Sequence, residues 1–137
     1  MKRLLALTGF LLLARPASAE SYEEHDYLLN CAGCHRMDGS GSRAVPSLRG
    51  MRELSEMPGA RAYWVRVPGA AQAPLTDARL AALMNWLVER FAGQKPSPAY
   101  TAEEVNRLRS TPLRDPIARR NEMRRAASHQ RWRLHRE

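Results

Sequence analysis

The chain has 137 residues, of which 44% are hydrophobic and 26% charged, and its formal net charge is +8. This length allows one compact domain plus an additional segment, and the composition is that of a globular protein rather than an integral membrane protein. The positive charge is unevenly placed. Residues 20–111 carry 11 basic and 11 acidic side chains, whereas residues 112–137 carry eight arginines and three acids. The net positive charge therefore comes from the two ends of the chain and not from the domain between them.

Residues 1–19 have the pattern of a secretory signal peptide. Lys2 and Arg3 precede an apolar run from Leu4 to Ala14, and Ala17-Ser18-Ala19 is a small-residue cleavage site. The run has 11 residues, whereas a bilayer span needs roughly 20. An uncleaved anchor is the alternative. We expect export to a bacterial periplasm, and a mature chain without a membrane span.

The first half of the mature chain contains one clear helix signal. Ser21 and Glu24 form a capping box, which predicts a short helix to about Asn30. Glycines and prolines are closely spaced over residues 36–74, so this region is predicted to contain only loops and short turns. Residues 63–67 are predicted to form a brief extended segment.

The strongest helix signal follows this region. Thr76 is a suitable N-cap, Asp77 favours the first turn, and Gly93 and Pro96 end the pattern. The apolar stripe consists of Leu80, Leu83, Met84, Leu87, Val88 and Phe91. This spacing predicts one helix with a buried face, and Met84 is assigned to the core.

The C-terminal part is predicted to contain a linker and two helices. Residues 92–100 have the composition of a linker, and Thr101 with Glu104 forms a second capping box. The helix that begins there should end at about Ser110, and the arginine-rich residues 117–136 should form another helix. With no internal repeat and no strand pattern, the fold class is predicted to be all-α.

The two cysteines are three positions apart and a histidine follows them, in the order Cys31-Ala32-Gly33-Cys34-His35. Two thiols on one helical turn suit the two vinyl groups of a haem, and the next imidazole suits the iron, so this motif is typical of covalent haem attachment. A thioredoxin-like dithiol needs a βαβ context, and a structural zinc site needs four ligands. A disulfide between the two cysteines would not account for the histidine that follows them. We predict one covalent haem c on Cys31 and Cys34, with His35 as the proximal iron ligand.

Around this motif, residues 21–92 resemble the class I cytochromes c, the small monohaem cytochrome c family of helical electron carriers. The resemblance rests on the haem motif, on Gly39 and Gly41, on Pro46-Ser47-Leu48-Arg49-Gly50 and on the helix 75–87. It implies a helical domain built around one covalent haem.

The resemblance also implies two contacts. The first and last helices of the domain should cross, with Tyr27 or Leu28 against Leu83 and Trp86. Pro46 should present its carbonyl oxygen to the proximal histidine. A metal-bound imidazole needs a partner on its other ring nitrogen, which fixes the tautomer and the basicity. The alternative is that Pro46 only stiffens a loop.

The sixth iron ligand is not specified by the resemblance. The family supplies a methionine in the loop before the last helix, but residues 68–74 contain neither methionine nor histidine. Met57, in a Met-Pro pair, is the first choice and Met51 the second. An iron without a strong distal protein ligand is the remaining alternative. A thioether ligand suits electron transfer, whereas an open position would admit gases or peroxide. Arg61 and Arg66 are expected to pair with haem propionates or solvent.

These patterns predict an electron carrier and not an enzyme. It would pass single electrons between a donor dehydrogenase and an acceptor, either as a free protein or as a subunit of a dehydrogenase complex. The alternative function is a haem protein with an open distal site that acts as a small-ligand sensor or weak peroxidase.

Residues 20–95 are expected to form the cytochrome c domain, and residues 96–137 a linker and a basic helical extension. Complementary charge speeds association, so the extension is predicted to steer docking onto an acidic face of a redox partner. Anionic lipid is a second target, a solvated helix is the plain alternative, and nucleic acid is not expected. The arginines of the extension are Arg114, Arg119, Arg120, Arg124, Arg125, Arg131, Arg133 and Arg136.

Overall fold

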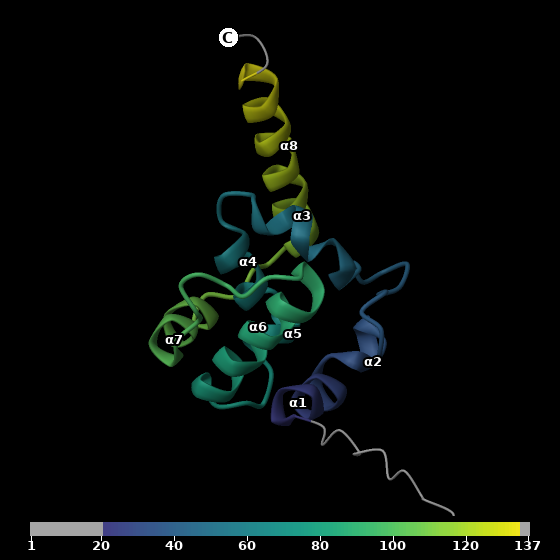
Figure 1. The fold of residues 1–137 in the computed structure, drawn as a ribbon, viewed down its shortest axis with the longest axis vertical. Helices are drawn as coiled ribbons and strands as arrows, with labels where there is room; N and C mark the ends of the chain where they lie inside the picture. Colours follow the sequence, from purple (N-terminus) through teal and green to yellow (C-terminus); the bar gives the residue numbers. More distant parts are fainter. Residues whose placement is uncertain (1–20, 135–137) are drawn as a thin grey trace, which may run out of the picture.

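The computed structural model describes residues 21–134, with side chains described as far as residue 129. The predicted signal peptide and Arg136 lie outside the described residues, as do the side chains of Arg131 and Arg133. Over the described range the fold is all-α, and no strand is present there (Figure 1). The helices are α1 (Tyr22–Asn30), α2 (Ala32–His35), α3 (Met51–Ser55), α4 (Ala60–Arg66), α5 (Pro68–Ala71), α6 (Asp77–Ala92), α7 (Ala102–Arg109) and α8 (Pro116–Leu134), with a 3-10 turn η1 at Leu48–Gly50.

Capping residues begin three of the helices where the sequence predicts. The side-chain oxygens of Ser21, Thr76 and Thr101 each accept a hydrogen bond from the backbone N–H three residues later, at 3.1, 3.3 and 3.2 Å. Each bond satisfies one of the free donors at a helix N-terminus. Gly93 ends α6 in the left-handed conformation, with a φ of 74°. The predicted bounds of α1, α6 and α7 are thus confirmed.

The prediction for residues 36–74 is wrong, because α3, α4 and α5 lie in this range. Residues 63–67, predicted to be extended, belong to α4 except for Val67, which ends that helix. The buried residues Ala60, Tyr63 and Trp64 are spaced i, i+3, i+4 and form a helical face. Gly59 and Pro68 stand at helix boundaries, so the breakers of this region separate short helices and do not exclude them.

Helix α6 lies at the centre of the core and packs against α1, α3 and α7. The ring of Tyr27 lies 5.6 Å from that of Trp86, which confirms the predicted contact between α1 and α6. Asp26, only 3% exposed, forms an ion pair with Arg79 of α6, so its buried charge is compensated. Leu83 is 1% exposed, and burial of a leucine contributes about 1.5–3 kcal/mol.

The last two helices take different places around this core. Helix α7 packs against α4, α5 and α6, and its Val105 is fully buried. Helix α8 packs against α4 near its start and then extends away from the other helices (Figure 1). None of the helices within residues 21–134 combines the length and the apolar composition needed to cross a membrane.

Candidate cofactor site

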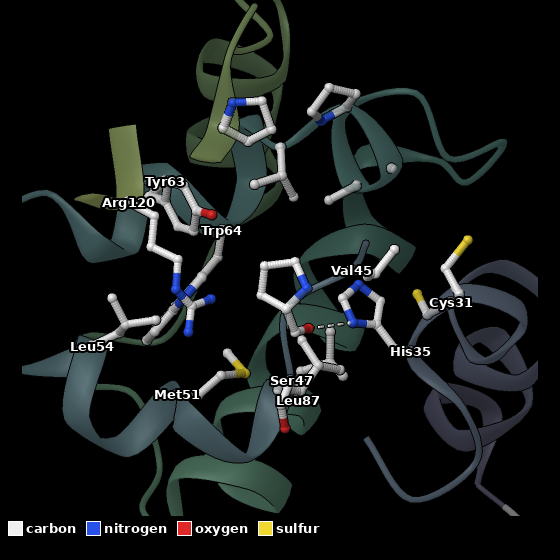
Figure 2. Close-up of a pocket in the computed structure, with 18 of the residues that line it drawn as sticks. Cys31, His35, Val45, Ser47, Met51, Leu54, Tyr63, Trp64, Leu87 and Arg120 are labelled. Carbon is white, nitrogen blue, oxygen red and sulfur yellow. Dashed lines mark hydrogen bonds between the residues drawn. The ribbon is translucent and has the colours of Figure 1, made fainter. Parts of the chain in front are cut away.

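A cavity of about 350 Å³ lies beside the Cys-x-x-Cys-His motif. Sites for small molecules and cofactors span roughly 300–1,000 Å³ and are mostly apolar. The lining residues come from the α1–α2 junction, the loop before η1, helices α3, α4 and α6, the segment 67–70 and the start of α8. Figure 2 shows Cys31 and His35 on one side of the cavity, and Met51, Leu54, Tyr63, Trp64 and Arg120 on the other.

Short helix α2 brings the two thiols and the imidazole to this cavity. The backbone N–H of Cys31 donates to the Tyr27 carbonyl at 2.8 Å, and that of His35 donates to the Cys31 carbonyl at 2.9 Å. The Tyr27 hydroxyl donates to the Arg36 carbonyl at 2.5 Å, where the chain leaves α2. Cys31, Cys34 and His35 therefore share one turn that is bonded to α1 at both ends.

Gly41 allows the loop after α2 to turn back towards the imidazole of His35. Gly41 has a φ of 71°, and its N–H donates to the His35 carbonyl at 3.0 Å. A Cβ at this position would lie 2.5 Å from the Val45 carbonyl oxygen, so only glycine fits. The turn places the Pro46 carbonyl oxygen 3.1 Å from His35 Nδ1, which is the contact expected from the resemblance.

This contact defines the state of the His35 ring. A carbonyl oxygen only accepts, so Nδ1 carries the hydrogen and Nε2 keeps a free lone pair. Burial lowers the pKa of His35, although the bond to Pro46 acts in the opposite direction. The neutral imidazole is thus favoured, with one nitrogen anchored and the other suited to a metal.

The two cysteines are not joined in a disulfide. Cys31 is half-buried and Cys34 is exposed. Burial raises the pKa of the Cys31 thiol to about 11, and the charge of Asp26 adds to the effect. Dithiol oxidoreductases lower the pKa of their attacking cysteine to form a thiolate. The environment of Cys31 has the opposite effect, so Cys31 does not have the low pKa of such an attacking cysteine.

Of the methionines considered as distal ligands, the structure brings Met51 to the cavity. Met51 is 2% exposed and lines the cavity, as does Met84 of α6. Met57 is 6% exposed and belongs to the hydrophobic core, but it is not among the lining residues. The segment before α6 contributes Val67, Pro68, Gly69 and Ala70 to the lining, and none of these has a side chain that binds iron.

Arg61 and Arg66, which were expected to pair with haem propionates or with solvent, do not line the cavity. Arg61 forms an ion pair with Glu104 of α7, and its guanidinium lies 3.9 Å from the centre of the Tyr100 ring. Arg66 donates to the Thr111 carbonyl at 2.7 Å. The arginine at the cavity is Arg120, which sequence reasoning placed in the basic extension only. Arg120 lies four residues after Pro116 and three after Ile117, which predicts that the three residues share one face of a helix. This spacing does not predict what that face packs against.

The donor set fits a covalently attached haem. Two unpaired thiols lie one turn apart, an imidazole beside them has one nitrogen anchored, and an apolar cavity adjoins all three. Among the described side chains, no three His, Cys, Asp or Glu groups are close enough to hold a metal ion by themselves. Comparison with known proteins gives no match: no family model fits the chain, and no curated protein or solved structure is significantly similar to it.

Proposed function

We propose that this chain is a periplasmic c-type cytochrome with one covalent haem, which passes single electrons between a donor dehydrogenase and an acceptor. One observation carries the proposal. Cys31, Cys34 and His35 border the same apolar cavity, and the Pro46 carbonyl fixes the ring of His35. The resemblance of residues 21–92 to the class I cytochromes c supports the same function.

The residues would act by holding and shielding the group. Cys31 and Cys34 would each hold the haem through one thioether bond, with sulfur on one carbon of a vinyl group and the thiol hydrogen on the other, so that no net oxidation would be needed. The Nε2 atom of His35 would bind the iron, while Pro46 keeps the imidazole in one tautomer and orientation. A bound haem would supply a one-electron ferric–ferrous couple. Buried Leu54 and Leu87 would exclude water from it.

The rim of the cavity offers an edge for electron exchange. The lining residues Cys34, Ala44, Gly69 and Ile117 are exposed, and Ile117 is 46% exposed. Helix α8, which begins at this cavity, carries exposed cationic side chains along its length. A redox partner with an acidic docking face would be attracted there, because complementary charge raises association rates.

Production of the full chain in a bacterium that attaches haem to exported proteins tests the proposal. We expect a periplasmic product that begins near Glu20, carries the mass of one haem and stays red after acid–acetone extraction. The Cys31→Ala/Cys34→Ala variant should release all its colour, because no thioether bond remains. Ser47→Ala, a lining change that affects neither sulfur, is the control. A colourless wild-type protein from cells that mature other c-type cytochromes would refute the proposal.

A second candidate function is a sensor or weak peroxidase with an open iron site. The observation that favours it is the lining at residues 67–70, where the family places its ligand loop and this chain supplies no donor side chain. Met57, the first choice for the distal ligand, does not line the cavity, so Met51 and Met84 are the thioethers available to close the site.

Carbon monoxide binding to the reduced protein separates the two functions. If Met51 closes the site, the wild type should bind the gas slowly and be low-spin when ferric, and Met51→Leu should become high-spin and bind it at least tenfold faster. Met84→Leu, of similar volume and burial, is the matched control and should behave as the wild type. A high-spin wild type that binds the gas at once would favour the open-site function.

A further inference from the structure

We propose that the C-terminal helix α8 is part of the cofactor site, and that Arg120 binds a carboxylate of the cofactor. The proposal rests on the proposed function, because the carboxylate is one of the two propionates of haem. It assigns to the extension a binding role that is separate from docking a partner.

Helix α8 begins at the wall of the cavity. Pro116, Ile117 and Arg120 all line it, and their spacing places them on one face of the first turns of α8. Figure 2 shows the side chain of Arg120 extending towards Leu54 and Met51, opposite His35. A Cβ at Gly50 would lie 3.5 Å from Arg120 Nη2, so the guanidinium reaches the start of α3. Arg120 therefore spans from α8 to α3 at the cavity.

The start of α8 is fixed in this place by the chain before it. The Leu113 N–H donates to the Arg66 carbonyl at 2.8 Å, which bonds the segment before α8 to the end of α4. The Asp115 carboxylate accepts the Ala118 N–H at 2.8 Å and caps the helix, with Pro116 at its first position. Arg120 thus projects from an anchored turn and not from the part of α8 that extends outward.

The charge of Arg120 calls for an anionic partner. Among the described residues that line the cavity, Arg120 alone has a permanent charge. It is half-buried, and within residues 21–129 no hydrogen bond or ion pair uses its guanidinium. A half-buried cation at an apolar cavity is costly unless an anion pairs with it. The planar fork of arginine matches a carboxylate in a two-bond geometry.

The reduction potential of the purified holoprotein tests this contact. A cation paired with a propionate stabilises the ferrous state, because ferric iron carries one more positive charge. Arg120→Gln should therefore lower the midpoint potential, and Arg120→Lys should recover part of the change. Arg125→Gln removes the same charge from an exposed position on the same helix and should leave the potential unchanged.

The salt dependence of the midpoint potential distinguishes a direct contact between Arg120 and the propionate from an effect of charge at a distance. The Debye length is about 3 Å at 1 M salt, so a solvent-screened effect disappears there while a contact pair largely persists. The lowered potential of Arg120→Gln should persist at that salt concentration. Arg120→Met keeps the apolar stem and serves as a second neutral variant if the glutamine protein does not accumulate.

The outcomes separate this proposal from the proposed function. A potential that is unchanged in both neutral variants, or a change that salt abolishes, would overturn the role of Arg120 and leave the cytochrome intact. A wild-type protein without thioether-bound haem would overturn both.

Discussion

Helices α7 and α8 are both rich in arginine, but the fold uses these side chains in opposite ways. Arg109 of α7 donates to the carbonyls of Ala71, Ala73 and Leu75 at 2.9, 2.7 and 2.8 Å, and to the Asp77 carboxylate at 3.1 Å. Arg120 of α8 has no such partner within residues 21–129 and faces a cavity. An arginine whose donors are satisfied by the fold is structural, whereas an arginine left without partners at a cavity is available to bind an anion.

The same contrast holds for each helix as a whole. Helix α7 is joined to α4 by the Arg61–Glu104 ion pair, and its Val105 is fully buried. In the described part of α8, Met123 is the one buried apolar side chain, and the Arg124–Glu53 ion pair is long, at 3.9 Å, and exposed. Exposed pairs of this kind contribute about 0–1 kcal/mol. Helix α7 thus belongs to the stable core, while α8 is held mainly at its start.

The largest effect on stability is expected from Arg109→Met. Loss of the guanidinium removes the Arg109 donors from the Ala71 and Leu75 carbonyls, whereas the Ala73 carbonyl keeps the Leu75 N–H as a donor at 2.8 Å. Ala71 is less than 10% exposed, so its carbonyl is left as a buried acceptor. A buried acceptor without a partner costs about 1–3 kcal/mol. We expect the free energy of unfolding to fall by about 2–4 kcal/mol, as measured by urea denaturation.

Two arginine variants serve as controls for this prediction. Arg107→Met changes an exposed side chain on α7, and Arg125→Met an exposed one on α8. Each should alter the free energy of unfolding by less than about 0.5 kcal/mol. Equal losses in all three proteins would show that arginine content, and not the bonds of Arg109, stabilises the fold.

The sequence predicts the surroundings of Cys31, Cys34 and His35, including the contact between His35 and Pro46, better than the rest of the cavity. The Cys-x-x-Cys-His motif, the capping boxes at Ser21 and Thr101 and the N-cap at Thr76 are local patterns, and local backbone geometry carries them into the structure. Met51 and Arg120 reach the cavity only because distant helices pack there. The spacing of side chains along one helix does not specify such contacts.

The prediction for residues 36–74 was wrong for a related reason. Gly59 and Pro68 bound a helix of only seven residues, so the apolar pattern of α4 is too short to be distinguished from a strand. Arg61 was expected to pair with a haem propionate or with solvent, but it pairs with Glu104, which lies 43 residues later in the chain. Opposite charges so far apart give no signal in a single sequence.

A smaller and pH-dependent effect is expected from Glu104→Gln, which breaks the link between α7 and α4. The hydrogen bond from Arg61 lowers the pKa of Glu104 below its ordinary value of 4.5. The folded state therefore holds this proton less tightly than the unfolded chain. The stabilisation by Glu104 is complete above about pH 4.5 and is lost as the pH falls through the lower folded-state value.

Glu104→Gln should be less stable than the wild type at pH 7, by less than about 1 kcal/mol for a partly exposed pair. This difference should shrink below about pH 4.5, because the unfolded chain takes up the proton there, whereas the folded carboxylate takes it up only at lower pH. Urea denaturation over pH 3–7 measures the difference. Glu103→Gln, an exposed neighbour on α7, is the matched control. If the Glu104→Gln difference is the same at pH 3 and pH 7, the Arg61–Glu104 charge interaction does not hold α7 in place. In that case the burial of Val105, and not the ion pair, explains why α7 is held more firmly to the fold than α8.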